Sequence, residues 1–124
     1  MKTDGHLTAL ILFAAFALLG TAKNAMAKDP VQVDPKHYHL EFENDQVRVL
    51  RITYGPHELS VMHEHPASVV ISLTDQDVKF SFPNGNSEER HLKAGQAVWH
   101  EAGSHLPENL SDKPLEAILV ELKK

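Results

Sequence analysis

The 124-residue sequence contains no cysteine and fewer basic than acidic residues, and each shortage excludes a class of protein. Without cysteine there is no disulfide framework, no thiolate metal site and no cysteine nucleophile. The 12 Lys and Arg against 17 Asp and Glu give a formal charge of -5, which argues against electrostatic binding of nucleic acid. Histidine is what the chain has in excess, with nine in one short sequence.

Long hydrophobic runs are also missing, apart from Leu7 to Leu19 near the N-terminus. This run is too short to span a bilayer comfortably, but it suits the apolar core of a signal peptide. Lys2 precedes it and Ala25-Met26-Ala27 supplies a small-x-small cleavage site. We expect a signal peptide over residues 1–27, a periplasmic or secreted protein, and no stable membrane span after leader cleavage. An uncleaved N-terminal anchor is the alternative.

The remainder of the chain has the pattern of an all-β domain. Residues 28–36, KDPVQVDPK, contain two prolines and little apolar content, so they are predicted to form an extended arm. From residue 37, apolar and polar residues alternate, as in VRVLRITY at 47–54. About seven such strands, with no amphipathic helix, predict an antiparallel sandwich or small barrel over 37–124. Asn84-Gly85 predicts a hairpin turn, because both residues tolerate a positive φ at low cost.

Two histidine segments carry the chemistry. His63 and His65 are two residues apart, so on a strand both imidazoles point to one face and offer two nitrogen ligands to a metal. Alone, such a pair is also compatible with a partly exposed surface site. A second segment, with a strand at 97–100, a glycine turn at Gly103 and then His105, supplies a third candidate ligand.

These residues resemble the two motifs of the cupin superfamily. Gly55 followed by His63-Glu64-His65 is similar to the first motif, although seven residues rather than five separate the glycine from the first histidine. The second motif matches at Gly95, Gly103, His105 and Asn109, with one residue fewer before the histidine and Glu101 in place of the usual proline. The resemblance extends over about residues 44–122.

The resemblance implies a single-domain, all-β cupin jelly-roll β-barrel at 37–124, preceded by the N-terminal signal helix. It also implies a divalent transition metal held by His63, His65 and His105, with Fe, Mn, Ni, Cu and Zn not distinguished. The family's fourth ligand, a glutamate, falls on Val69 or Val70, neither of which can coordinate a metal.

Three outcomes follow for the site. A three-His site keeps coordination positions open for water or substrate, as a catalytic metal requires. Alternatively His100, or less readily His57, adds a fourth nitrogen. Finally, the metal site has decayed and the pocket holds an organic ligand or nothing specific.

Two classes of function remain open. The first is a metal-dependent enzyme of the oxygenase type or a related class, and the second is a non-catalytic periplasmic cupin that holds a metal or a small ligand. Both have a small molecule as ligand or substrate, and by analogy with the family two copies pair as a homodimer. Glu64 and Glu101 are expected to be solvated acids unless the pocket buries them.

Other side chains have structural expectations. Phe80, Phe82 and Trp99 are expected to fill the core. Asn109 is expected to satisfy backbone groups of a turn. The histidines expected at the surface are His37, His39 and His91.

Overall fold

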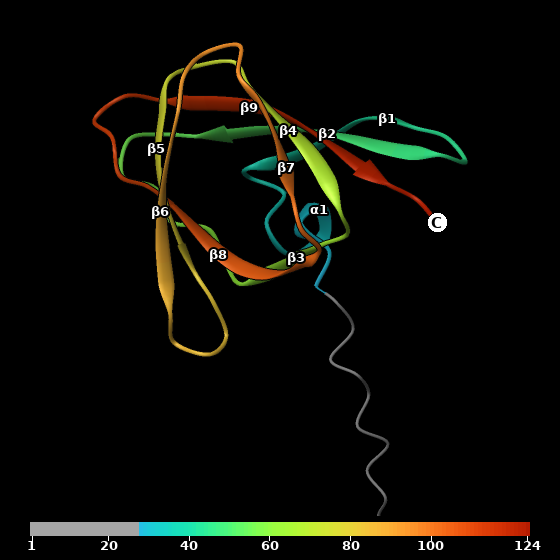
Figure 1. The fold of residues 1–124 in the computed structure, drawn as a ribbon, viewed down its shortest axis with the longest axis horizontal. Helices are drawn as coiled ribbons and strands as arrows, with labels where there is room; N and C mark the ends of the chain where they lie inside the picture. The colour runs from blue at the N-terminus through green and yellow to red at the C-terminus, as the bar shows by residue number, and fades with distance from the viewer. Residues whose placement is uncertain (1–27) are drawn as a thin grey trace, which may run out of the picture.

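The computed structural model describes residues 28–124, and the predicted signal peptide at 1–27 lies outside the described residues. Two antiparallel sheets face each other (Figure 1). One has the strand order β1-β2-β9-β4-β7 and the other β3-β8-β5-β6. The elements are α1 (Pro30–Val33), β1 (Tyr38–Glu43), β2 (Val47–Tyr54), β3 (His63–His65), β4 (Ser68–Ser72), β5 (Gln76–Ser81), β6 (Ser87–Leu92), β7 (Ala97–His100), β8 (Gly103–Asn109) and β9 (Leu115–Leu122).

The period-two alternation of the sequence defines the inner face of each sheet. β2 and β9 pair over their full length, from Val47 opposite Leu122 to Tyr54 opposite Leu115. Every second residue is buried along β9, and along β2 from Leu50 onward. Removing these apolar side chains from water is the main force holding the two sheets together. The predicted all-β, two-sheet jelly roll is confirmed. Its core consists of Tyr38, Leu50, Ile52, Tyr54, Val78, Leu115, Ala117 and Leu119.

The predicted hairpin at Asn84-Gly85 is present between β5 and β6, but only one of the two residues has a positive φ. Gly85 has a φ of 86°, and its N–H donates to the carbonyl of Phe82 at 3.0 Å. Pro83 holds the second position of this turn, where its fixed φ suits a type I geometry. A three-residue loop with glycine at the left-handed position therefore closes the hairpin.

Residues 28–36 differ from the extended arm that was expected. The carboxylate of Asp29 accepts a hydrogen bond from the N–H of Val31 at 3.0 Å, and Pro30 occupies the first helical turn. An N-capping aspartate followed by proline is a strong helix start, so α1 forms although it is only one turn long. Pro30 is buried, Val31 packs against the core, and the carbonyl of Lys28 accepts from the N–H of Glu64. The segment therefore packs against the barrel.

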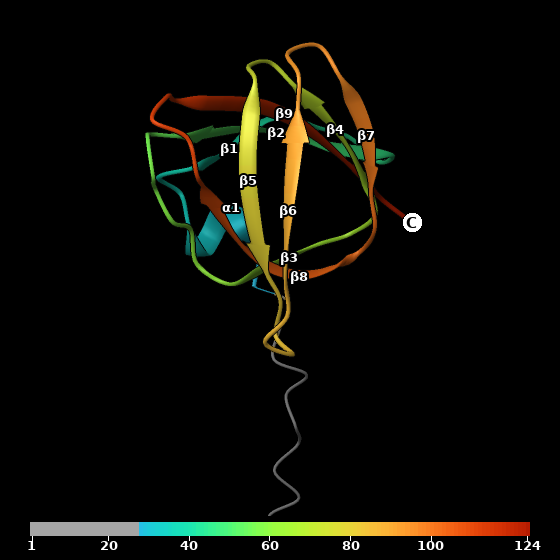
Figure 2. The ribbon, with the colours of Figure 1, turned by 60° about the vertical axis from the view of Figure 1, so that its left-hand side comes forward.

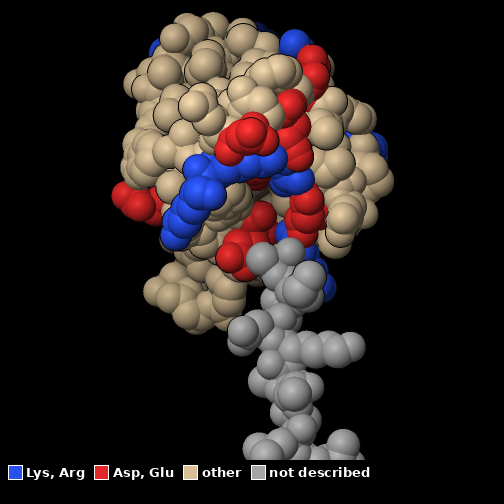
Figure 3. Space-filling view, turned by 90° about the vertical axis from the view of Figure 1, so that its right-hand side faces the viewer, with Lys and Arg blue, Asp and Glu red and all other residues tan. Residues whose placement is uncertain are grey.

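Charged side chains do not gather by sign on the face in Figure 3. Lys and Arg there lie beside Asp and Glu, in keeping with the ion pairs between neighbouring strands, such as Arg51 with Glu41 and Glu116. Within residues 28–124, no helix is both long and apolar enough to cross a membrane.

The aromatic side chains divide between core and surface. Phe80 packs against the core as predicted, and Phe82 is half-buried. The expectation for Trp99 was wrong, because its side chain is 51% exposed. β7 is an edge strand on which Val98 and His100 take the inner face, so alternation turns the indole outward, where Nε1 donates to the carboxylate of Glu101 at 2.8 Å.

The histidines outside the two motifs are also divided. His39 and His91 are exposed, as predicted, but His37 is buried. Its ring stacks on that of Tyr54 with 4.3 Å between centroids, and both of its nitrogens face carboxylates. The expectation that His37 lies at the surface was wrong because Tyr54 and Glu58, unlike Asp34, are brought to it from later parts of the chain.

Candidate metal centre

Three buried imidazoles meet on the inner face of the four-stranded sheet. β3 and β8 are antiparallel and place His63 directly opposite His105, and His65 opposite Gly103. All three rings are almost completely buried, and their candidate ligand atoms lie within 4.8 Å of one another. The prediction that His63, His65 and His105 converge from two distant segments is confirmed.

The spacing of two ring nitrogens matches the needs of one shared cation. The Nε2 atoms of His63 and His105 are 3.2 Å apart, and the two rings are nearly perpendicular. With metal–nitrogen bonds of about 2.0–2.1 Å, neighbouring donors lie ~2.9 Å apart around an octahedral ion and ~3.4 Å apart around a tetrahedral one. The observed separation falls between these values.

Hydrogen bonds on the far side of two rings fix their tautomers. Nδ1 of His63 donates to the carbonyl of Val61 at 2.8 Å, and Nδ1 of His65 donates to the carboxylate of Glu121 at 2.7 Å. Because each Nδ1 carries the proton, each Nε2 presents a lone pair to the interior. This is the tautomer that a metal ligand needs.

The interior also keeps the rings of His63 and His105 neutral. Burial, with a smaller contribution from the neighbouring His65, lowers the pKa of His63 from 6.5 to about 4. The pKa of His105 is lowered as well, first by burial and then by the surrounding histidines. Since only a neutral imidazole binds a metal, both groups are ready to coordinate at neutral pH.

A chain of buried charges orients His65. Glu121 accepts from His65 and also from Nε of Arg48 at 2.6 Å, and Arg48 in turn makes two hydrogen bonds to the carboxylate of Asp29. Burial alone would raise the pKa of Glu121, but the bonds from His65 and Arg48 outweigh it and leave that pKa lowered. Glu121 was missed in the sequence. Its signal was an acid at an inward position of a strand whose other inward residues are apolar.

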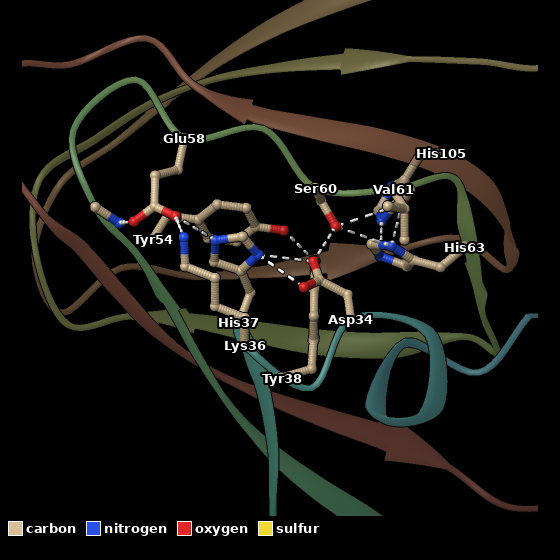
Figure 4. A network of polar contacts seen from close by, with 11 residues as sticks. Asp34, Lys36, His37, Tyr38, Tyr54, Glu58, Ser60, Val61, His63 and His105 are labelled. Carbon is tan, nitrogen blue, oxygen red and sulfur yellow. Dashed lines mark hydrogen bonds and ion pairs between the residues drawn. The ribbon is translucent and has the colours of Figure 1, made fainter.

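A second polar network reaches His63 from the same N-terminal segment (Figure 4). Asp34, directly after α1, accepts from the hydroxyl of Ser60 at 2.5 Å, and that hydroxyl lies 3.4 Å from Nδ1 of His63. Asp34 also bonds the buried His37, whose other nitrogen faces Glu58 at 2.8 Å. Each histidine of the His-x-His pair is thus connected to an aspartate of the 28–36 segment.

The other candidate ligands take different places. His100 lies beside the cluster, with its ring centroid 4.9 Å from that of His105, and its Nδ1 donates to the carbonyl of Glu101. It remains a predicted fourth ligand. His57 is on the surface and pairs with Asp112, away from the three rings. Val69 and Val70 stand where the resemblance places the glutamate ligand, and Val70 lines a cavity next to the cluster.

The carboxylates near the motifs are not buried in the site. Glu64 points to the opposite face of β3 from the two histidines and is only half-buried. Glu101 is exposed and accepts from Trp99. Asn109 has its expected role, since its amide donates to the carbonyls of Gly55 and Lys113.

An apolar cavity of about 60 Å³ adjoins the cluster. His65, His100 and His105 line one part of it, and the rest is mainly aliphatic and aromatic. Close by, the buried hydroxyl of Ser68 has no hydrogen-bond partner among the described residues, although it is in register with Glu121 and His100 on the neighbouring strands. A buried polar atom without a partner costs about 1–3 kcal/mol, so an oxygen ligand or water held there would be stabilising. The site therefore fits a bound metal with open positions.

The architecture has known counterparts, although no family model and no curated protein matches the chain. A cupin domain from Bordetella pertussis has a TM-score of 0.65 at 24% identity, over 70% of this chain and 92% of that one. The chain has the cupin fold. An RmlC-like cupin family protein with a double-stranded β-helix fold, from Methanocaldococcus jannaschii, gives 0.55 at 18% identity, over 72% of this chain and 83% of that one.

A lyase is also among the similar structures. The DMSP lyase DddQ from Ruegeria pomeroyi has a TM-score of 0.54 at 17% identity, over 73% of this chain and 49% of that one. At such identities the likeness establishes the cupin fold alone, because one fold supports many chemistries. The chemistry of this chain therefore has to be inferred from its own residues.

Glu121→Gln should weaken metal binding about 10–100-fold. The carboxylate of Glu121 orients the His65 ring and makes it a more basic ligand, and the amide of glutamine lacks that charge. Chelator competition measures the affinity. Glu116→Gln is the matched control, since Glu116 lies on the same strand but pairs with Arg51 away from the cluster. Equal metal affinity in the two variants would contradict the role given to Glu121.

Acid should destabilise the metal-free protein through His63. The unfolded ring takes up a proton near pH 6.5, whereas the folded ring does so only at about 4. Because the unfolded state binds more protons between these values, the contribution to the free energy of unfolding is fully present above about pH 6.5 and is lost as the pH falls toward 4. We expect a loss of about 3 kcal/mol, measured by chemical denaturation.

The matched control for this titration is His39→Gln, which removes an exposed ring and should keep the wild-type pH dependence. His63→Gln should reduce the pH dependence by the share of that ring, while the lowered pKa of His105 maintains the remainder. If the free energy of unfolding of the wild-type protein stays constant between about pH 6.5 and 4, the folded protein does not require a neutral His63 ring, and the prediction is wrong.

Proposed function

We propose that this protein is an exported cupin that binds one divalent transition metal through His63, His65 and His105. The observation that carries the proposal is the pair of Nε2 atoms 3.2 Å apart, in buried rings whose pKa values are lowered. Neutral imidazoles suit iron, manganese, nickel, copper and zinc to different degrees, and three of them leave coordination positions open.

The favoured activity is that of a metal-dependent enzyme of the oxygenase type or a related class. A cation at the site would supply Lewis acidity or an open position for a substrate oxygen. The chain's own residues bind and position the substrate: the cavity excludes water with apolar side chains, and His100 stands at its edge as the predicted fourth nitrogen.

The alternative is a non-catalytic cupin that holds a metal or a small ligand. One observation favours it: Val70, and not a carboxylate, faces the cavity where the resemblance places the glutamate ligand. Glu64 and Glu101 also lie outside the cavity lining, so neither is placed as a general base.

Elemental analysis of the protein, purified without an affinity tag, tests the metal site. We expect one equivalent of a transition metal, lost in His63→Ala and in His105→Ala but retained in His91→Ala, which removes an exposed histidine. Oxygen uptake or substrate turnover that disappears when the metal is removed would favour the enzyme over the non-catalytic cupin. A metal-free protein that cannot be reconstituted contradicts the metal site and favours the non-catalytic cupin, with a decayed metal site, that holds a small ligand.

Export has its own test. The proposed leader ends at Ala27, so the mature protein isolated from the periplasm or medium should begin at Lys28. Intact-mass measurement gives the start point directly. Cell-associated protein that retains residues 1–27 would support the uncleaved anchor instead.

A further inference from the structure

The two sheets leave an open seam between β6 and β7. Each is the last strand of its own sheet, and the two are joined only through the turn at 93–96 (Figure 2). Arg90 and Leu92 of β6, with Val98 and His100 of β7, line a small cavity of about 40 Å³ at this seam. Because His100 also lines the cavity beside the three-His cluster, the seam adjoins the candidate metal site.

Arg90 is an unusual residue for such a position. It pairs in register with Val78, a core residue, so it shares the inner face of the sheet. Its guanidinium carbon lies 5.3 Å from the ring centroid of Phe80, and Phe80 stacks on His105 at 4.8 Å. Arginine, aromatic ring and metal-site histidine therefore form three successive layers leading inward from the seam.

The guanidinium is free to exchange its partner. Its ion pair is with Glu88 at 2.6 Å, and the two side chains are 35% and 47% exposed. Ion pairs at such exposure contribute little to stability, so replacing Glu88 by another carboxylate costs little.

The charge around the seam favours an anion. Imidazole ligands bring no negative charge to a bound divalent cation and would leave its charge uncompensated, while the buried Glu121 is already matched by Arg48. The two cavities that Arg90 lines, the one at the seam and another beside Trp99, have one carboxylate in their lining, Glu101, which is bonded to Trp99. Glu108 lines the cavity beside the cluster. Arg90 adds a further positive charge to the two cavities that it lines.

We propose that the seam between β6 and β7 binds a small organic carboxylate. Its carboxylate lies on Arg90, its carbon chain lies against Phe80, and its far end is directed toward the three-His cluster. This inference rests on the proposed function, because the metal centre is what the far end of the molecule meets. It names the substrate class of that site as small, largely apolar acids.

Butyrate and its neutral analogue butyramide, added to the cobalt(II)-loaded protein, test the inference. Paramagnetic broadening of the ligand's proton signals reports both affinity and orientation. We expect butyrate to bind more tightly than butyramide, and its methyl protons to broaden more than those beside the carboxylate.

Three variants sharpen the test. Arg90→Gln should weaken butyrate binding about tenfold or more, because a charge-assisted bidentate contact is lost. Glu88→Gln should strengthen it, because the competing carboxylate is removed. Arg51→Gln is the matched control, since Arg51 is an arginine of similar exposure that pairs with two glutamates outside the seam.

The failures of the two proposals are distinguishable. If the wild-type protein takes up no cobalt, the proposed function fails and the carboxylate site fails with it. If cobalt binds, the inference alone is overturned by any of three results: equal binding of butyrate and butyramide, no change in Arg90→Gln, or strongest broadening of the protons beside the carboxylate, which would mean direct coordination by the carboxylate.

Discussion

The pairing of His63 with His105 across β3 and β8 is the interaction on which the candidate site depends. Opposite residues of an antiparallel pair have Cα atoms only ~4.5–5.5 Å apart, so two inward imidazoles must meet. Alternation then adds His65 to the same face without any further loop or helix. A shift of one residue in this register would turn both histidines of β3 away from the cavity.

Burying the histidine cluster leaves polar atoms that need hydrogen-bond partners, and the N-terminal segment completes the two networks that supply them. Each Nδ1 needs an acceptor, and a buried acceptor such as Glu121 needs a partner of its own, which Arg48 provides. Asp29 then holds Arg48, while Asp34 reaches His63 through Ser60. The segment expected to be a loose arm is for this reason the support of the site.

Alternation and motif spacing were enough to predict the two-sheet fold and the three histidines, because both are encoded within short stretches of sequence. Glu121 was not predictable in this way, since its partners Arg48 and His65 are 73 and 56 residues distant along the chain. The same holds for the burial of His37. Trp99 was misplaced because alternation does not say which of its two sets of residues faces inward, and on β7 the inner face belongs to Val98 and His100.

The position of Asp29 and Asp34 on either side of α1 links two equilibria. If docking of this segment raises the affinity for a cation by some factor, the bound cation raises the stability of the docked segment by the same factor. The first residues of the folded body and the centre of the barrel are therefore thermodynamically coupled. A change that loosens the docking of residues 28–36 should therefore also lower the affinity of the site for the ion.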